Sequence, residues 1–175
     1  MKIVLTGGGT AGHIMPNIAL LKYFKKYFRE IIYIGSESGM EKGIAEKHGI
    51  PFYSVPVIKL VRRKFLVNLK IPFVLKNGVE KAKELLIKLK PSVIYSRGGY
   101  VALPVVFAAS KLGIPIVCHE ADFNMGLANR LTARHAAAVF TSYESDKKMP
   151  AGYCRRTVRR DIAFPARNAT LHPLT

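Results

Sequence analysis

The stretch Leu5-Thr6-Gly7-Gly8-Gly9-Thr10-Ala11-Gly12-His13 decides the fold of this chain. It follows an apolar segment that predicts a buried strand, Lys2–Leu5, and it leads into a helical stripe of Ile18, Leu21, Phe24 and Phe28. Glycines at such a junction let the backbone turn sharply and approach a ligand closely. The amide groups and dipole of the following helix favour an anion such as phosphate. Since His13 adds a titratable group to the same turn, we expect a site of chemistry there.

Strand-like and helix-like segments alternate along the chain. Short apolar runs predict strands at Lys2–Leu5, Ile31–Ile34, Phe52–Val55, Val93–Tyr95, Ile114–Cys118 and Ala137–Phe140. Helical patterns lie between them at Asn17–Phe28, Met40–Lys47, Phe65–Lys76, Gly78–Leu89, Val101–Leu112 and Gly126–Arg134. Alternation with continuously apolar strands predicts an α/β fold, a Rossmann-like doubly wound parallel sheet with helices on both faces.

Three unusual loops follow predicted strands. They are the glycine loop after the first strand, Ser96–Tyr100 after the fourth, and His119–Asp122 after the fifth. In an open parallel sheet, ligands bind outside the carboxyl ends of the strands, where the strand order reverses. We therefore expect these loops to meet at one edge of the sheet.

The chain length fits one domain, predicted over residues 1–150, followed by a linker or irregular tail at 151–175. The tail contains the charge run Arg155–Asp161 and no periodic pattern. The two cysteines, Cys118 and Cys154, have no metal-like spacing, which predicts two reduced thiols.

The charge is strongly positive: 28 Lys and Arg stand against 11 Asp and Glu, a formal net charge of +17. In the segment Lys59–Lys76, cations alternate with large apolar side chains. Such a segment suits the headgroup boundary of an anionic membrane. Nucleic-acid sites pair cations with stacking aromatics or amides instead, so no nucleic-acid partner is predicted. An ordinary core helix with a basic outer face remains the alternative.

The glycines and His13 allow more than one interpretation. Gly7, Gly9 and Gly12 satisfy the G-x-G-x-x-G spacing of dinucleotide sites, which makes an NAD(P)-binding oxidoreductase domain the alternative function. The acidic residue that this fingerprint requires, Glu37, sits a little past the expected place. His13 is either a general base that deprotonates a sugar hydroxyl or a helix-start histidine bonded to a neighbouring loop.

The other two loops also carry polar groups. Gly98 and Gly99 either cradle a phosphate beside Arg97 or form a tight turn. The adjacent His119 and Glu120 are suited to orient a hydroxylated substrate, and no third ligand at metal-like spacing accompanies them. The sequence has no Asp-x-Asp pair, no Walker lysine and no G-x-S-x-G elbow. We predict neither a metal nor a cofactor.

Taken together, the loops resemble the N-terminal domain of the MurG family of glycosyltransferases, glycosyltransferase family 28. The resemblance covers about residues 1–145. It is carried by Gly8–Pro16, Gly98–Val101, His119-Glu120 and Gly126–Asn129, with Met40-Glu41 and Gly113-Ile114-Pro115 in addition.

The resemblance implies one half of a GT-B fold and a GlcNAc transferase whose N-terminal half binds the acceptor. The donor would be UDP-GlcNAc and the acceptor lipid I, on the cytoplasmic face of the cell membrane. His13 would be the catalytic base. Donor contacts would come from Thr10, Ala11, Gly12, Asp122 and Arg159, and acceptor contacts from Gly98, Gly99, Tyr100, His119 and Glu120.

The chain departs from the family pattern in three places. Ala11 replaces a common glycine, and Thr157 stands where a proline precedes the Val-Arg pair. The sequence ends where the second domain of the family begins, so we expect either a fragment or a natural half that works with a separate donor-binding domain. A non-catalytic membrane-surface half that needs a partner is the remaining alternative.

Overall fold

A computed structural model describes residues 1–59, 68–142 and 155–157. Its strands are β1 (Lys2–Thr6), β2 (Glu30–Ser36), β3 (Phe52–Val55), β4 (Val93–Ser96), β5 (Ile116–Glu120), β6 (Ala138–Thr141) and β7 (Arg155–Thr157). Its helices are α1 (Ala11–Ala19), α2 (Leu21–Tyr27), α3 (Glu41–Lys47), α5 (Ile71–Leu89), α6 (Ala102–Lys111) and α7 (Leu127–Ala133). The expected α/β architecture is confirmed.

The strands form one parallel sheet in the order β3-β2-β1-β4-β5-β6-β7. The chain runs outward from β1 to β3 and returns to β4 on the other side of β1. This reversal places the topological switch point between the carboxyl ends of β1 and β4, where ligands bind in folds of this kind.

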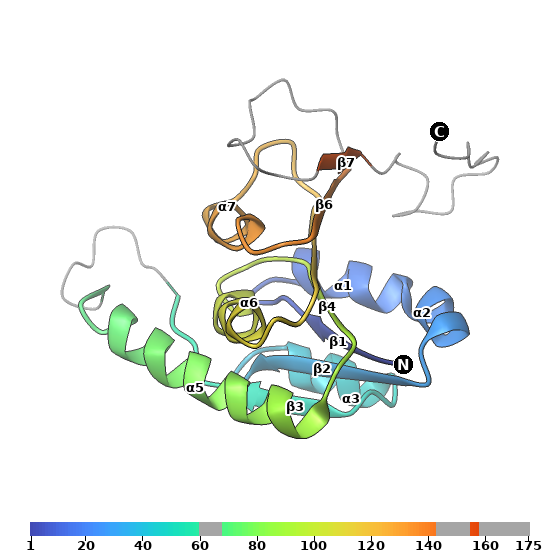
Figure 1. The fold of residues 1–175 in the computed structure, drawn as a ribbon, viewed down its shortest axis with the longest axis horizontal. Helices are drawn as coiled ribbons and strands as arrows, with labels where there is room; N and C mark the ends of the chain where they lie inside the picture. Colours follow the sequence, from blue (N-terminus) through green and yellow to red (C-terminus); the bar gives the residue numbers. More distant parts are fainter. Residues whose placement is uncertain (60–67, 143–154, 158–175) are drawn as a thin grey trace.

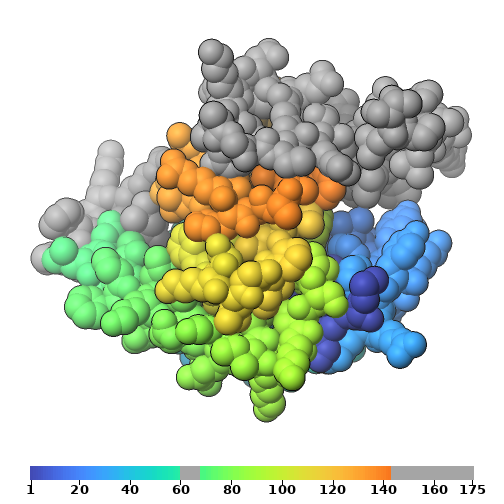
Figure 2. Space-filling view, viewed as in Figure 1, coloured from blue at the N-terminus to red at the C-terminus, as the bar shows by residue number. Residues whose placement is uncertain are grey.

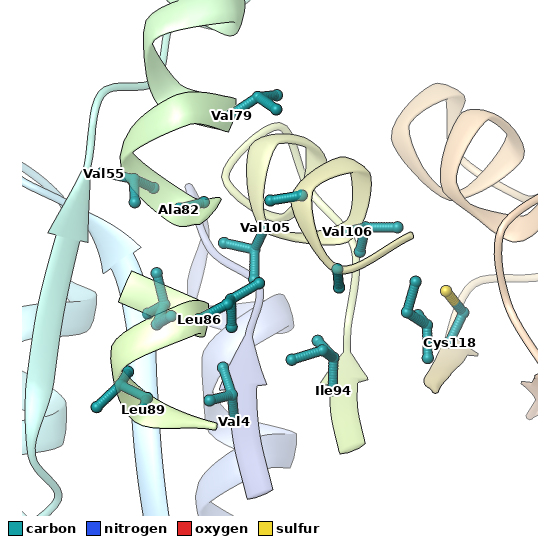
Figure 3. Close-up of a cluster of buried hydrophobic side chains, with 14 of the residues drawn as sticks. Val4, Val55, Val79, Ala82, Leu86, Leu89, Ile94, Val105, Val106 and Cys118 are labelled. Carbon is teal, nitrogen blue, oxygen red and sulfur yellow. The ribbon is translucent and has the colours of Figure 1, made fainter. Parts of the chain in front are cut away.

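Helices cover both faces of the sheet (Figure 1). Val4 and Ile94 belong to a buried cluster with Leu86 of α5 and Val105 of α6, shown in Figure 3. Ile3, Leu5 and Tyr33 point the other way, into a cluster with Leu20, Leu21 and Ala45 from the α1–α3 side. Because successive residues of β1 and β2 alternate between two buried faces, these central strands are apolar along most of their length. Figure 2 shows α5 (green) and α6 (yellow) side by side on the molecular surface.

Several element boundaries differ from those predicted. The first helix begins at Ala11, directly after the glycine loop, and a turn at Leu20 separates α1 from α2. Pro16 therefore lies inside α1 and not in its first turn. β5 begins two residues later than predicted and includes His119 and Glu120, because Gly113 adopts a left-handed conformation and Pro115 has no amide to donate.

The two helices predicted at Phe65–Lys76 and Gly78–Leu89 also differ, since α5 is a single helix that runs through Gly78. Residues 65–67 lie outside the described part. A Cβ on Gly78 would come within 2.3 Å of the carbonyl oxygen of Pro56, so this glycine permits close packing and does not end a helix. β7, for which no strand was predicted, pairs with β6. The domain boundary at residue 150 stays a prediction.

Candidate active site at the carboxyl edge of the sheet

The glycine loop after β1 is anchored to the protein on two sides. The hydroxyl of Tyr33 on β2 donates to the carbonyl of Gly7 at 2.6 Å. The amide of Gly9 donates to Oε1 of Glu41 at 2.7 Å. Gly7 and Gly9 have backbone φ angles of 140° and 86°, which residues other than glycine rarely adopt. The loop therefore has one fixed shape, and it delivers the chain to Thr10, the extended residue before α1.

The loop after β4 contacts the glycine loop directly. Gly98 and Gly99 both have left-handed backbones, with φ of 77° and 76°. A Cβ on Gly99 would lie 2.3 Å from the carbonyl oxygen of Gly8 and 3.1 Å from Cδ2 of His13. The close approach confirms that the first two predicted loops meet at one edge of the sheet.

His13 is held by the β4 loop. Its Nδ1 lies 2.9 Å from the carbonyl oxygen of Arg97. A carbonyl oxygen only accepts hydrogen bonds, so Nδ1 carries the proton and Nε2 of the neutral ring carries the lone pair. The side chain is partly exposed. The bond to a neighbouring loop is therefore present, and Nε2 has no hydrogen-bond partner among the described residues. The role of His13 as a general base stays a prediction.

His119 lies on the same edge but is buried. Its Nδ1 is 2.8 Å from the hydroxyl of Tyr95, and its Nε2 is 3.1 Å from Oγ of Ser142. Burial, together with the charge of Arg97, lowers the pKa of His119 to about 3. The ring is therefore neutral at physiological pH, and both nitrogens have partners inside the protein. This geometry favours a role in positioning over direct contact with the acceptor.

Glu120 is also committed to internal bonds. Its Oε1 accepts the amide of Asp122 at 3.0 Å, and its Oε2 accepts the amide of Gly126 at 3.1 Å and Nδ2 of Asn129 at 2.9 Å. Asn129 in turn packs against Gly98, where a Cβ would lie 2.3 Å from its Oδ1. Glu120 therefore organises the loop between β5 and α7 and links it to the β4 loop.

The remaining predicted residues are more open to solvent. Thr10, Ala11 and Gly12 are exposed at the start of α1, and Asp122 is exposed after β5. The ring of Tyr100 covers Gly9, where a Cβ would come within 2.3 Å of Cε1. Arg159 lies outside the described residues.

Unsatisfied polar atoms gather at this edge. In the described ranges, the buried side-chain atoms without a hydrogen-bond partner belong to Thr6, Asn17, Glu41, Arg97, Asn129 and Thr141. Thr6 and Thr141 end their strands, and Arg97 follows β4. Folded proteins satisfy nearly all buried polar groups, so such a concentration marks a place where water or a ligand completes the structure. The same part of the chain contains no group of three side chains suited to hold a metal ion.

The geometry argues against a dinucleotide at this loop. In dinucleotide sites the second glycine lets the backbone approach the pyrophosphate. Here that glycine is Gly9, whose amide is bonded to Glu41 and whose open side is covered by Tyr100. Sequence reasoning missed both contacts, because the glycines that make room for Glu41 surround it only in the folded chain.

Solved structures with the same fold include a MurG, a UDP-GlcNAc 2-epimerase and a glycosyltransferase. MurG of Acinetobacter baumannii is 25% identical, with a TM-score of 0.75 over 90% of this chain and 44% of that one. UDP-GlcNAc 2-epimerase of Methanocaldococcus jannaschii is 20% identical, with a TM-score of 0.60 over 82% and 40%. A Streptomyces glycosyltransferase is 16% identical, with a TM-score of 0.59 over 89% and 53%. The fold is one Rossmann-like half of a GT-B glycosyltransferase.

The family model of the glycosyltransferase family 28 N-terminal domain matches residues 3–141, and the chain belongs to this family. A relative in Lachnospira eligens is 47% identical over 152 residues, which are 86% of this chain and 43% of the relative. One in Bacillus cereus is 46% identical over 147 residues, 84% of this chain and 42% of the relative. Both are named UDP-N-acetylglucosamine–N-acetylmuramyl-(pentapeptide) pyrophosphoryl-undecaprenol N-acetylglucosamine transferase, the second with the number 2. The chain spans less than half the length of these relatives.

Proposed function

We propose that this chain is the acceptor-binding half of a glycosyltransferase that moves GlcNAc from UDP-GlcNAc to lipid I and forms lipid II for peptidoglycan. The names of the relatives support the donor and the acceptor. The observation that carries the chemistry is the position of His13, whose Nε2 has no hydrogen-bond partner among the described residues, at the edge where the β1 and β4 loops meet.

In the proposed reaction, Nε2 of His13 accepts the proton of the acceptor C4 hydroxyl while the hydroxyl oxygen attacks the anomeric carbon of the donor. The new glycosidic bond forms as the bond to UDP breaks, with inversion at that carbon. The carbonyl of Arg97 fixes the ring and stabilises the imidazolium that results, because it accepts the proton on Nδ1. The proposal requires no metal ion.

Further residues surround this centre in the proposal. Thr10–Gly12 and Asp122 are exposed and are available to the donor. Gly98, Gly99 and Tyr100 line the acceptor side, where the buried guanidinium of Arg97 supplies positive charge for a pyrophosphate. His119 and Glu120 hold the β4 and β5 loops in place through the bonds described above. Arg159 is retained as a donor contact on the strength of the resemblance alone.

We also propose that the segment 59–76 rests on the anionic cytoplasmic face of the cell membrane. In its described part, Leu69 and Phe73 are 57% and 75% exposed. A groove of about 370 Å³ between α5 and α6 is lined by apolar residues, by the cations Lys76 and Lys111 and by the acid Glu80. Apolar side chains beside cations suit an anionic bilayer surface. No helix in the described residues is long and apolar enough to cross a membrane.

The proposal is tested by fusing the chain to the part of the Lachnospira eligens relative that it does not match. We expect the fusion to transfer labelled GlcNAc to a soluble lipid I analogue, and the 175-residue chain alone to show little or no turnover. His13→Ala in the fusion is expected to lower kcat by about 10²- to 10⁴-fold, the usual contribution of a general base, with an unchanged circular dichroism spectrum. An unchanged kcat excludes the base role. Binding of NADH to the chain with micromolar affinity excludes the transferase assignment.

A further inference from the structure

Glu41, the first residue of α3, is a buried acid that the proposed reaction does not use. Its side chain is 0% exposed. Oε1 accepts the amide of Gly9 at 2.7 Å, and Oε2 has no hydrogen-bond partner among the described residues. The two ion pairs of the described chain, Lys2 with Glu30 and Lys81 with Glu84, lie elsewhere. A buried carboxylate without a cationic partner costs several kcal/mol, so its presence calls for a reason.

The backbone is shaped to admit this carboxylate. A Cβ on Gly8 would lie 1.8 Å from Oε1, and a Cβ on Gly39 would lie 1.5 Å from Oε2. A Cβ on Gly35, at the end of β2, would come within 3.1 Å of the Cβ of Glu41. Glycines from three separate segments therefore leave room for one side chain. Because a side chain at Gly8 would overlap Glu41, the glycine loop packs closely against the carboxylate.

The loop that Glu41 holds leads directly to His13. Gly9 is followed by Thr10, the residue before α1, and the amide of His13 donates to the carbonyl of Thr10 at 3.1 Å. The ring of Tyr100 also packs on Gly9. Of the two hydrogen bonds that anchor the loop, the one from Gly9 to the carboxylate lies nearer to the first turn of α1 and its histidine.

We infer that Glu41 is a positioning residue: its carboxylate clamps the amide of Gly9 and thereby holds His13 in register with the carbonyl of Arg97. The consequence for catalysis rests on the proposed function of His13. The clamp itself does not, because it is a property of the loop that is measurable without substrate.

The test uses the full 175-residue chain, labelled with ¹⁵N, and two variants. Amide hydrogen exchange at Gly9 measures the clamp, and the ring ¹⁵N shifts of His13 at pH 8 report which nitrogen carries the proton. Glu41→Ala removes the acceptor. Glu41→Gln removes the charge and keeps an oxygen that can occupy the position of Oε1. Glu46→Ala, an exposed acid on the same helix, is the matched control.

We expect Glu41→Ala to lower the protection of the Gly9 amide by about tenfold or more, as befits the loss of a bond to a charged group. His13 should change from the Nδ1-protonated form to a mixture. Glu41→Gln should keep Gly9 protected within about threefold of the parent chain, and keep the His13 form. The inference is overturned by a folded Glu41→Ala variant with unchanged Gly9 protection and unchanged His13 shifts. If Glu41→Ala does not fold, Glu41→Asp is measured in its place, because its shorter side chain keeps the charge and withdraws the oxygen from the Gly9 amide. Unchanged Gly9 protection and unchanged His13 shifts in that variant overturn the inference, and lowered protection with a changed His13 form supports it.

Discussion

Glu120 offers the sharpest test of how the site is built, because the carboxylate accepts three hydrogen bonds from one loop and its helix. Glu120→Gln leaves a single oxygen. If that oxygen takes the place of Oε2, the bonds from Gly126 and Asn129 survive, but the new amide faces the N–H of Asp122, so that donor meets donor.

The cost can be worked from these contacts. A hydrogen bond to a charged group contributes about 1.5–3 kcal/mol, with values near the lower end where water can replace the partner, as at the partly exposed amide of Asp122. Glu120→Gln loses one such bond and weakens two, and should reduce the free energy of unfolding by about 2 kcal/mol. Glu120→Ala loses all three and should cost about 4.5 kcal/mol or more.

Urea unfolding followed by circular dichroism at pH 7 measures both values, with the exposed Glu46→Gln on α3 as control. A Glu120→Gln variant within about 0.5 kcal/mol of the parent chain, as for ordinary surface substitutions, would refute the reasoning. That result would favour the alternative in which the carboxylate of Glu120 is available to bind the acceptor.

Three further predictions concern single side chains. Folding lowers the pKa of His119 from its ordinary value of 6.5 to about 3, so the unfolded chain binds the extra proton and stability is lost as pH falls below 6.5. Between pH 6 and 4 the parent chain should lose about 1.4 kcal/mol per pH unit more than His119→Gln in urea titrations, and parallel curves would contradict this. Burial raises the pKa of the Cys118 thiol to about 11, so in a Cys154→Ser variant a thiol reagent at pH 8 should react about 100-fold slower than with a free thiol until urea is added. Phe73→Asp should reduce flotation with anionic liposomes several-fold, whereas Ile87→Asp, exposed on the same helix, should not. Equal losses in the two variants would contradict the proposal that segment 59–76 binds the membrane.

The fold was predictable because its signals are local and repeated. Each strand from β1 to β6 contains an apolar run, helical stripes lie between these strands, and parallel strands bring their carboxyl ends to one edge. The meeting of His13 with Gly99 follows from this topology alone. The predicted helix boundaries were wrong where one residue type can play two roles. Gly78 was interpreted as the start of a new helix, but in the structure it allows α5 to pack closely against Pro56.

The internal bonds of the site were not predictable in the same way. Sequence shows that His119 and Glu120 are adjacent, but not that their polar atoms are already bonded to Tyr95, Ser142 and Asn129. These hydrogen-bond partners lie in other strands, helices and loops, and whether they reach His119 or Glu120 depends on the direction in which each side chain points.

The central claim is that the edge around His13 and Gly99 receives a pyrophosphate-linked sugar. It is tested most directly by titrating the ¹⁵N-labelled chain separately with a soluble lipid I analogue and with NADH. We predict that the lipid I analogue shifts the resonances of the His13 ring and the Gly99 amide at concentrations where NADH leaves them unchanged. Shifts caused by NADH and not by the lipid I analogue, or shifts confined to the opposite edge of the sheet, would contradict the account.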